Sequence, residues 1–325
     1  MWNLRATPRS LGMLAAILLM GVGQPAGAGD RVVLASWDGV RRDVLHELLQ
    51  WQPLAEEPVP CPTSRLVTIY PVECNGYQTC LPNLCRFQII DSNDTEGKPL
   101  TRPQHAQMLT GYGPRETGEI TNSGTAGVPP GLTIYERIAA ARPEVRTVHV
   151  GGLKYIGQGV IHWATALGAL NLAMRRGSRD QYTGENTTAQ FQVGLDFIDG
   201  DPFFFFIHFK AADVVGHRAG ARSNQYREAI MQNDAQLGSM LEILADYGVL
   251  DSTQVYVTTD HGFDGIFHTN INHATVSQTW IASSAHDLQP ENARILDVAP
   301  TLLDALGIDT GNAEPPYRGH SLLVH

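Results

Sequence analysis

The sequence predicts an α/β fold, a three-layer sandwich in which helices cover both faces of a mostly parallel central sheet. Two observations lead to this prediction. Short runs rich in β-branched and aromatic residues alternate with segments of helical spacing, and two of these runs end in an aspartate. With 325 residues, 43% of them hydrophobic, the chain is long and apolar enough to build one large domain.

The first segment, residues 1–28, has the pattern of a secretory signal peptide. Two arginines precede an apolar run over residues 11–22, and small residues follow at Ala26 and Ala28. The run is short for a membrane span. We therefore expect an exported protein, periplasmic or secreted, whose mature chain is a single catalytic domain over residues 29–325 with no stable membrane span.

The charge of the mature chain is strongly negative. Removal of Arg5 and Arg9 leaves 21 of the 23 basic residues against 33 acidic ones, so the net charge changes from -10 to -12. A nucleic-acid partner is therefore not expected, because the phosphate backbone repels such a surface.

Apolar runs along the mature chain predict buried parallel strands at residues 31–38, 146–152, 203–209, 254–260 and 279–283. The clearest helix lies between Asn224 and Tyr247, where apolar residues recur at helical spacing. The polar stretch from Arg175 to Thr188 has the composition of an exposed loop, and we expect a lid segment near residues 155–195.

All four cysteines, Cys61, Cys74, Cys80 and Cys85, lie in one Pro- and Gly-containing insertion near residues 55–90. Because the protein is expected to be exported, the leading interpretation is two disulfides, for which three pairings are open. A zinc knuckle is the alternative, although no C-x-x-C spacing occurs.

Polar residues cluster where the predicted strands end, which is where α/β sheets bind their ligands. Carboxylates and imidazoles at such positions are suitable ligands for zinc and similar divalent cations. A single such aspartate is usually a helix cap or a turn residue, but a series at successive strand ends favours a metal site. The candidates are Asp38, Asp213, His217, Asp260, His261 and His273.

Thr101 begins the stretch TRPQHAQMLTG and has two possible roles. As an N-cap, its hydroxyl would satisfy free N–H groups of a helix over residues 102–109. As a nucleophile, it would be held at the positive end of the helix dipole, where an anion is stabilised. The segment alone does not choose between these roles.

Taken in order, the segments SWDGVRRDVL, TRPQHAQMLTG, ADVVGHRAG, TTDHGFDG, ILDVAPTLLDALGI and RGHSLL resemble the alkaline phosphatase superfamily, in its branch of nucleotide pyrophosphatase/phosphodiesterases and sulfatase-like hydrolases. The resemblance covers most of the mature chain. It implies two zinc ions, with another divalent metal possible in one site. One metal would be bound by Asp38, Thr101, Asp260 and His261, and the other by Asp213, His217 and a late histidine. His273 is our choice for this last ligand, and His268 is its rival.

The same resemblance implies that Thr101 is a metal-bound nucleophile that forms a phosphothreonine intermediate. Asn122 corresponds to an asparagine that donates to a phosphoryl oxygen, with a turn residue before Gly124 as its alternative role. Lys154 resembles the lysine of sulfatase and monoesterase members, or is a solvated side chain.

The sequence thus predicts a hydrolase of small phosphate esters, of phosphodiesterase type. Sulfatases of this fold carry C/S-x-P-x-R, whereas this chain has Thr101 and His105 at those places, which disfavours sulfatase chemistry. A phosphomonoesterase or a phosphoryl transferase on the same scaffold remains open. A binding module with structural metals is disfavoured, because such a site has no need for Thr101.

Overall fold

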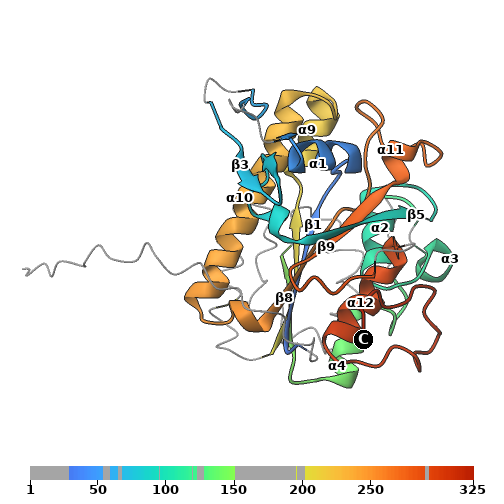
Figure 1. The fold of residues 1–325 in the computed structure, drawn as a ribbon. Helices are drawn as coiled ribbons and strands as arrows, with labels where there is room; N and C mark the ends of the chain where they lie inside the picture. Colours follow the sequence, from blue (N-terminus) through green and yellow to red (C-terminus); the bar gives the residue numbers. More distant parts are fainter. Residues whose placement is uncertain are drawn as a thin grey trace, which may run out of the picture.

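The computed structural model describes residues 29–53, 59–64, 68–94, 96–118, 120–122, 128–150, 195, 202–289 and 293–325. The predicted signal peptide lies outside these ranges, as does the predicted lid apart from Leu195. Within the ranges, a seven-stranded sheet forms the centre of the molecule (Figure 1). In spatial order its strands are β10 (Ala293–Arg294), β5 (Gln88–Asp94), β9 (Thr279–Ser283), β8 (Thr253–Thr258), β1 (Arg31–Trp37), β7 (Phe203–Phe209) and β6 (Arg146–Val150).

The sheet is mostly parallel, as predicted, with one reversed strand. β1 pairs in parallel with β7 and β8, and β6 pairs in parallel with β7. β9 exists where predicted but runs antiparallel to both β8 and β5, so the expectation of a parallel strand was wrong there. An apolar run that is buried on both faces has the same composition in either direction, so its direction is not encoded locally.

Two layers of helices cover the sheet and confirm the sandwich architecture. Side-chain alternation along β1 places Val33 and Ala35 in one apolar cluster, and Val32 and Leu34 in the other. The first cluster includes residues of α1 (Arg42–Leu49), α9 (Ala211–Ala219) and α10 (Asn224–Asp246). The second includes residues of α2 (Thr101–Met108), α4 (Ile134–Ala141) and α12 (Val298–Ala305).

Short helices among the described residues are η1 (Leu84–Arg86), α3 (Pro114–Thr117), η3 (Leu250–Ser252), α11 (Ala274–Ser277) and η4 (Ile295–Asp297). The predicted helix from Asn224 is confirmed as α10, and the hydroxyl of Ser223 caps it by accepting from the N–H of Tyr226. No helix in the described part of the chain combines the length and the apolar character needed to cross a bilayer.

The cysteine-containing insertion carries two disulfides, Cys61–Cys80 and Cys74–Cys85, as the sequence predicted. The same insertion contains a small antiparallel sheet of β2 (Gln52–Pro53), β4 (Tyr77–Thr79) and β3 (Val72–Cys74). Cys74 lies in β3, and Cys80 directly follows β4. The insertion is attached to α1 through the N–H of Cys80, which donates to the carbonyl of Leu48 over 2.9 Å.

Candidate metal centre

The predicted metal ligands meet at one edge of the central sheet. Asp38 directly follows β1, and the pair Asp260 and His261 follows β8. Asp213 and His217 lie on α9, which begins two residues after β7 ends. β1 lies between β7 and β8 and is parallel to both, so the carboxyl ends of the three strands share one edge.

The first donor group consists of Asp38, Asp260 and His261, all completely buried. Nε2 of His261 is 3.3 Å from Oδ2 of Asp260 and 3.6 Å from Oδ1 of Asp38. Thr101 reaches the same nitrogen, with its Oγ1 3.4 Å away. Atoms that ligate one tetrahedral zinc ion at about 2.0–2.2 Å lie roughly 3.3–3.6 Å apart, so these spacings suit a shared cation.

The second donor group consists of Asp213, His217 and His268. Nε2 of His217 is 3.4 Å from Oδ1 of Asp213, and Nε2 of His268 is 3.8 Å from the same oxygen. The D-x-x-x-H spacing places Asp213 and His217 on one face of α9, as the sequence indicated. His261 also lies close to Asp213 and His268, so the two groups are contiguous.

The imidazoles of both groups present bare Nε2 atoms to the centre. Nδ1 of His217, His261 and His268 faces the backbone carbonyls of Ile266, Gly262 and Pro99 at 2.9, 3.1 and 2.7 Å. Because a carbonyl oxygen only accepts, each Nδ1 must carry the proton and donate it. In the neutral tautomers the Nε2 atoms of His217 and His268 then face each other as lone pairs, only 3.0 Å apart. A cation between them satisfies both.

The carboxylates show the same lack of donors. Oδ1 of Asp38, Oδ1 of Asp213 and Oδ2 of Asp260 are buried and have no hydrogen-bond partner among the described residues. Burial raises the pKa of Asp38 well above its usual value, and the nearby Asp260 and Asp213 raise it further. Burial, followed by the charge of Asp260, raises the pKa of Asp213 to about 7. Buried oxygens of like charge that converge without donors fit a bound cation, which supplies the missing positive charge.

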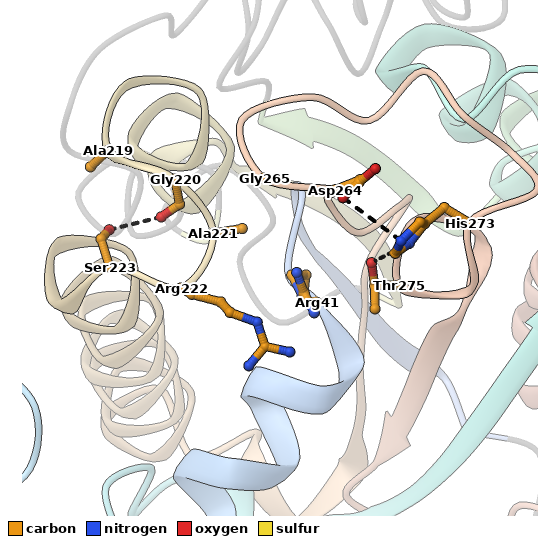
Figure 2. Close-up of a pocket in the computed structure, with 10 residues that line it drawn as sticks. All are labelled: Arg41, Ala219, Gly220, Ala221, Arg222, Ser223, Asp264, Gly265, His273 and Thr275. Carbon is orange, nitrogen blue, oxygen red and sulfur yellow. Dashed lines mark hydrogen bonds and ion pairs between the residues drawn. The ribbon is translucent and has the colours of Figure 1, made fainter.

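His273 lies elsewhere. Its Nδ1 is 2.8 Å from Oγ1 of Thr275, and its Nε2 is 3.7 Å from Oδ1 of Asp264. It lines a cavity of about 390 Å³ between the α9–α10 corner and the loop before β9, together with Arg41 and Arg222 (Figure 2). Of the two histidines that the sequence left open, the structure brings His268 to Asp213 and His217.

Thr101 is the first residue of α2 rather than its cap. The N-cap position belongs to Leu100, whose side chain makes no capping bond. The hydroxyl of Thr101 instead points toward His261. Asn122 lies beside it, with its Oδ1 accepting from the N–H of Arg102 over 2.9 Å. Lys154 lies outside the described residues, and its role stays a prediction.

Two glycines allow the close approach of backbone at the centre. Gly39 has a φ of +69°, and a Cβ there would lie 2.7 Å from the ring of Phe263. At Gly262, a Cβ would lie 2.0 Å from the carbonyl oxygen of Thr275. The segments SWDG and TTDHG therefore need glycine for packing around the ligands.

Sequence reasoning missed a polar layer beneath the ligands, formed by Ser36, His105 and His208. Nε2 of His208 is 2.8 Å from Oδ2 of Asp38, and Nε2 of His105 is 2.8 Å from Oγ of Ser36. Nδ1 of His105 donates to the carbonyl of Thr101 over 2.7 Å. The sequence did contain one indication of a role for His208, because it is the single polar residue in the otherwise apolar strand FFFFIHF.

Comparison with known proteins supports this architecture. The family model described as "Type I phosphodiesterase / nucleotide pyrophosphatase" matches residues 144–307, a range that includes Asp213, Asp260 and His268. Asp38 and Thr101 precede the matched range. The comparison with curated proteins gives no significant match.

Solved structures share the fold at low sequence identity. A 2-O GAG sulfatase is similar with a TM-score of 0.55 and 14% identity, over 90% of this chain and 75% of that chain. A phosphonate monoester hydrolase from Silicibacter pomeroyi is similar with a TM-score of 0.53 and 14% identity, over 90% of this chain and 75% of that chain.

Proposed function

Because the chain belongs to the type I phosphodiesterase / nucleotide pyrophosphatase family, we propose that this hydrolase is an exported, two-metal phosphodiesterase with Thr101 as its nucleophile. The observation that carries the proposal is the convergence beside the Thr101 hydroxyl of two groups of donors that share His261, with His217 next to the second. Export is supported by the disulfides Cys61–Cys80 and Cys74–Cys85, since such bonds persist in oxidising compartments.

We assign Asp38, Thr101, Asp260 and His261 to one cation, and Asp213, His217 and His268 to the other. His268 takes the place that the family resemblance gave to His273, because its Nε2 is 3.0 Å from that of His217. The donor set of carboxylates and imidazoles suits zinc, and one site also suits a harder divalent ion such as manganese.

Bound divalent cations would supply Lewis-acid stabilisation of the phosphoryl oxygens and lower the pKa of the Thr101 hydroxyl. Oγ1 of Thr101 attacks phosphorus, the bond to the leaving ester oxygen breaks, and a phosphothreonine forms. Water then attacks phosphorus, the bond between phosphorus and Oγ1 breaks, and a proton from the water restores the Thr101 hydroxyl. The N-terminal position of Thr101 in α2 places the anionic phosphoryl group at the positive end of the helix dipole.

Asn122 is assigned to orient the substrate. The N–H of Arg102 holds the oxygen end of its amide at α2, and the nitrogen end is the donor for a phosphoryl oxygen. Lys154 is kept as a candidate for a second oxygen, on the resemblance alone.

The test is a substrate panel measured with the mature chain. We expect bis(p-nitrophenyl) phosphate to be hydrolysed with a kcat/KM at least about tenfold above that of p-nitrophenyl phosphate, and p-nitrophenyl sulfate to be the poorest substrate. Chelator should abolish turnover, zinc should restore it, and metal analysis should find two ions per chain. Full activity of a metal-free preparation would contradict the proposal. A preference for the monoester would assign the same centre to a phosphomonoesterase.

A further inference from the structure

His208 is a polar residue in an unusual place. It is completely buried near the end of β7, within the run FFFFIHF. By strand alternation it shares a face with Phe204 and Phe206, the face that packs against α2. Register pairs it with Ser36 of β1, two residues before Asp38. Burying an imidazole among phenylalanines costs free energy unless its nitrogens are hydrogen-bonded, so its partner matters.

The partner on one side is Asp38. Nε2 of His208 lies 2.8 Å from Oδ2 of Asp38. With a cation bound, the carboxylate of Asp38 is ionised and only accepts, so the imidazole donates. This bond occupies one carboxylate oxygen and fixes the rotation of the group. The other oxygen, Oδ1, is buried without a hydrogen-bond partner among the described residues and lies 3.6 Å from Nε2 of His261.

The two carboxylate oxygens of Asp260 differ in the same way, but its hydrogen-bond donors are different. Its Oδ1 accepts from the backbone N–H groups of Gly39 and His261, each over 3.0 Å, and its Oδ2 is left facing the centre. Each aspartate thus has one carboxylate oxygen fixed by hydrogen bonds and one that faces the centre. At Asp260 the holding groups are backbone, whereas at Asp38 the holding group is a side chain that can be substituted.

The ring of His208 is itself held in place. It meets the ring of His105 edge to face, with centroids 5.0 Å apart. His105 in turn connects the Thr101 carbonyl and the Ser36 hydroxyl at 2.7 and 2.8 Å. The orientation of His208 is therefore coupled to the start of α2.

We propose that His208 is a positioning residue that holds Oδ2 of Asp38, so that Oδ1 is presented to the cation. The inference rests on the proposed two-metal centre. It predicts that the donated hydrogen bond of His208, rather than the bulk of its ring, sets the affinity of the Asp38 site for metal.

The experiment compares His208→Gln with His208→Met, which have similar length and volume but differ in the terminal amide donor. Zinc affinity is measured by competition with a chromophoric chelator, and the melting temperature of each metal-free variant is recorded beside it. His208→Phe serves as a second apolar replacement that keeps a ring. We expect the apolar variants to bind one of the two zinc ions about 10–100-fold less tightly than the parent, and His208→Gln to recover most of that loss.

Equal zinc affinity of the parent and a folded apolar variant would overturn the inference. So would equal losses in His208→Gln and His208→Met, because the donor would then have no separate effect. If His208→Gln folds with parental affinity but neither apolar variant folds, the bond serves the fold and the inference is also wrong. A parent that binds no zinc would instead overturn the proposed function, and this inference with it.

Discussion

The metal centre and the joint between the disulfide-bonded insertion and α10 both bury aspartates, with opposite surroundings. Asp234 on α10 accepts from the N–H of Leu84 over 2.7 Å and from the N–H and side-chain amide of Asn83 over 3.2 and 3.0 Å. Asp38 has one oxygen held by His208, and its other oxygen faces further acceptors. Burial raises the pKa of both carboxyls.

The difference separates a structural contact from a candidate cation site. At Asp234 the donors come from the chain itself, so the carboxylate connects the insertion to α10 without any ligand. At Asp38 carboxylate oxygens and unprotonated imidazole nitrogens converge, and while the carboxylates are ionised none of these groups can donate to another. A change in the first region should therefore affect stability, and a change in the second should affect metal binding and turnover.

Replacement of Thr101 should have the largest effect, and chiefly on turnover, because Asp38, Asp260 and His261 still hold the cation. Thr101→Ala is expected to lower kcat for the preferred phosphate ester at least about 10³-fold, because it removes the attacking oxygen. Thr101→Ser should keep measurable activity. Steady-state kinetics of both variants is the measurement, with metal content and melting temperature confirming that the alanine variant is folded and loaded.

A folded, metal-loaded Thr101→Ala variant with turnover within tenfold of the parent would remove the nucleophile assignment. The hydroxyl would then be a structural group of α2. The strongest evidence that changes at the centre affect turnover rather than stability would be lost.

Replacement of His268 should have the next largest effect and is matched by replacement of His273. His268→Ala should lose one of two zinc equivalents and more than about 100-fold in kcat/KM, because it removes a direct ligand. His273→Ala should keep both ions, since its ring contacts Asp264 and Thr275 instead. Metal analysis after dialysis against buffered micromolar zinc measures both. Loss of an ion from the His273 variant alone would restore the assignment made from the family resemblance.

The two histidines show where sequence reasoning stops. Strand ends are predictable from apolar runs, and these placed Asp38, Asp213 and Asp260 at one edge because the strands before them are parallel neighbours. His268 and His273 lie in a loop whose path depends on a turn in which Asp264 and Phe267 exchange backbone hydrogen bonds. That turn is followed by His268, whose Nδ1 reaches the carbonyl of Pro99, and no local pattern encodes this long-range contact.

The direction of a strand and the contacts behind the metal ligands could not be predicted from the sequence either. β9 fits the pattern of a buried strand but its reversal follows from its pairing with β8 and β5. β5 reads QIIDSND, a run too polar to predict as a central strand. The role of His208 depends on the cross-strand register of β1 and β7, which a single sequence does not contain.

Removal of the Cys74–Cys85 disulfide should affect stability without affecting the centre. The bond closes a loop with a sequence separation of 11, and its loss is expected to cost about 3 kcal/mol of unfolding free energy from chain entropy. The double variant Cys74→Ser/Cys85→Ser, unfolded in urea beside the parent, measures this cost. Its zinc content and kcat at a temperature where it is folded should equal those of the parent. A loss of zinc would mean that the insertion supports the centre.

The smallest expected effect is the pH dependence of Asp234. Burial raises its pKa in the folded protein to about 6, whereas the unfolded chain has an ordinary value near 3.9. The folded state therefore binds more protons between these values, and the contribution of Asp234 to stability is present at low pH and is lost as the pH rises through 6.

Asp234→Asn removes this titration while keeping the shape of the side chain. The unfolding free energy of the parent minus that of the variant should fall by about 1 kcal/mol between pH 5 and pH 7. Urea titrations of both proteins at pH 5, 6 and 7 measure the difference, in which the histidines and the metal centre cancel. A difference that rises with pH would mean that Asp234 is stabilised as an anion by its donors, and that burial is the weaker of the two effects.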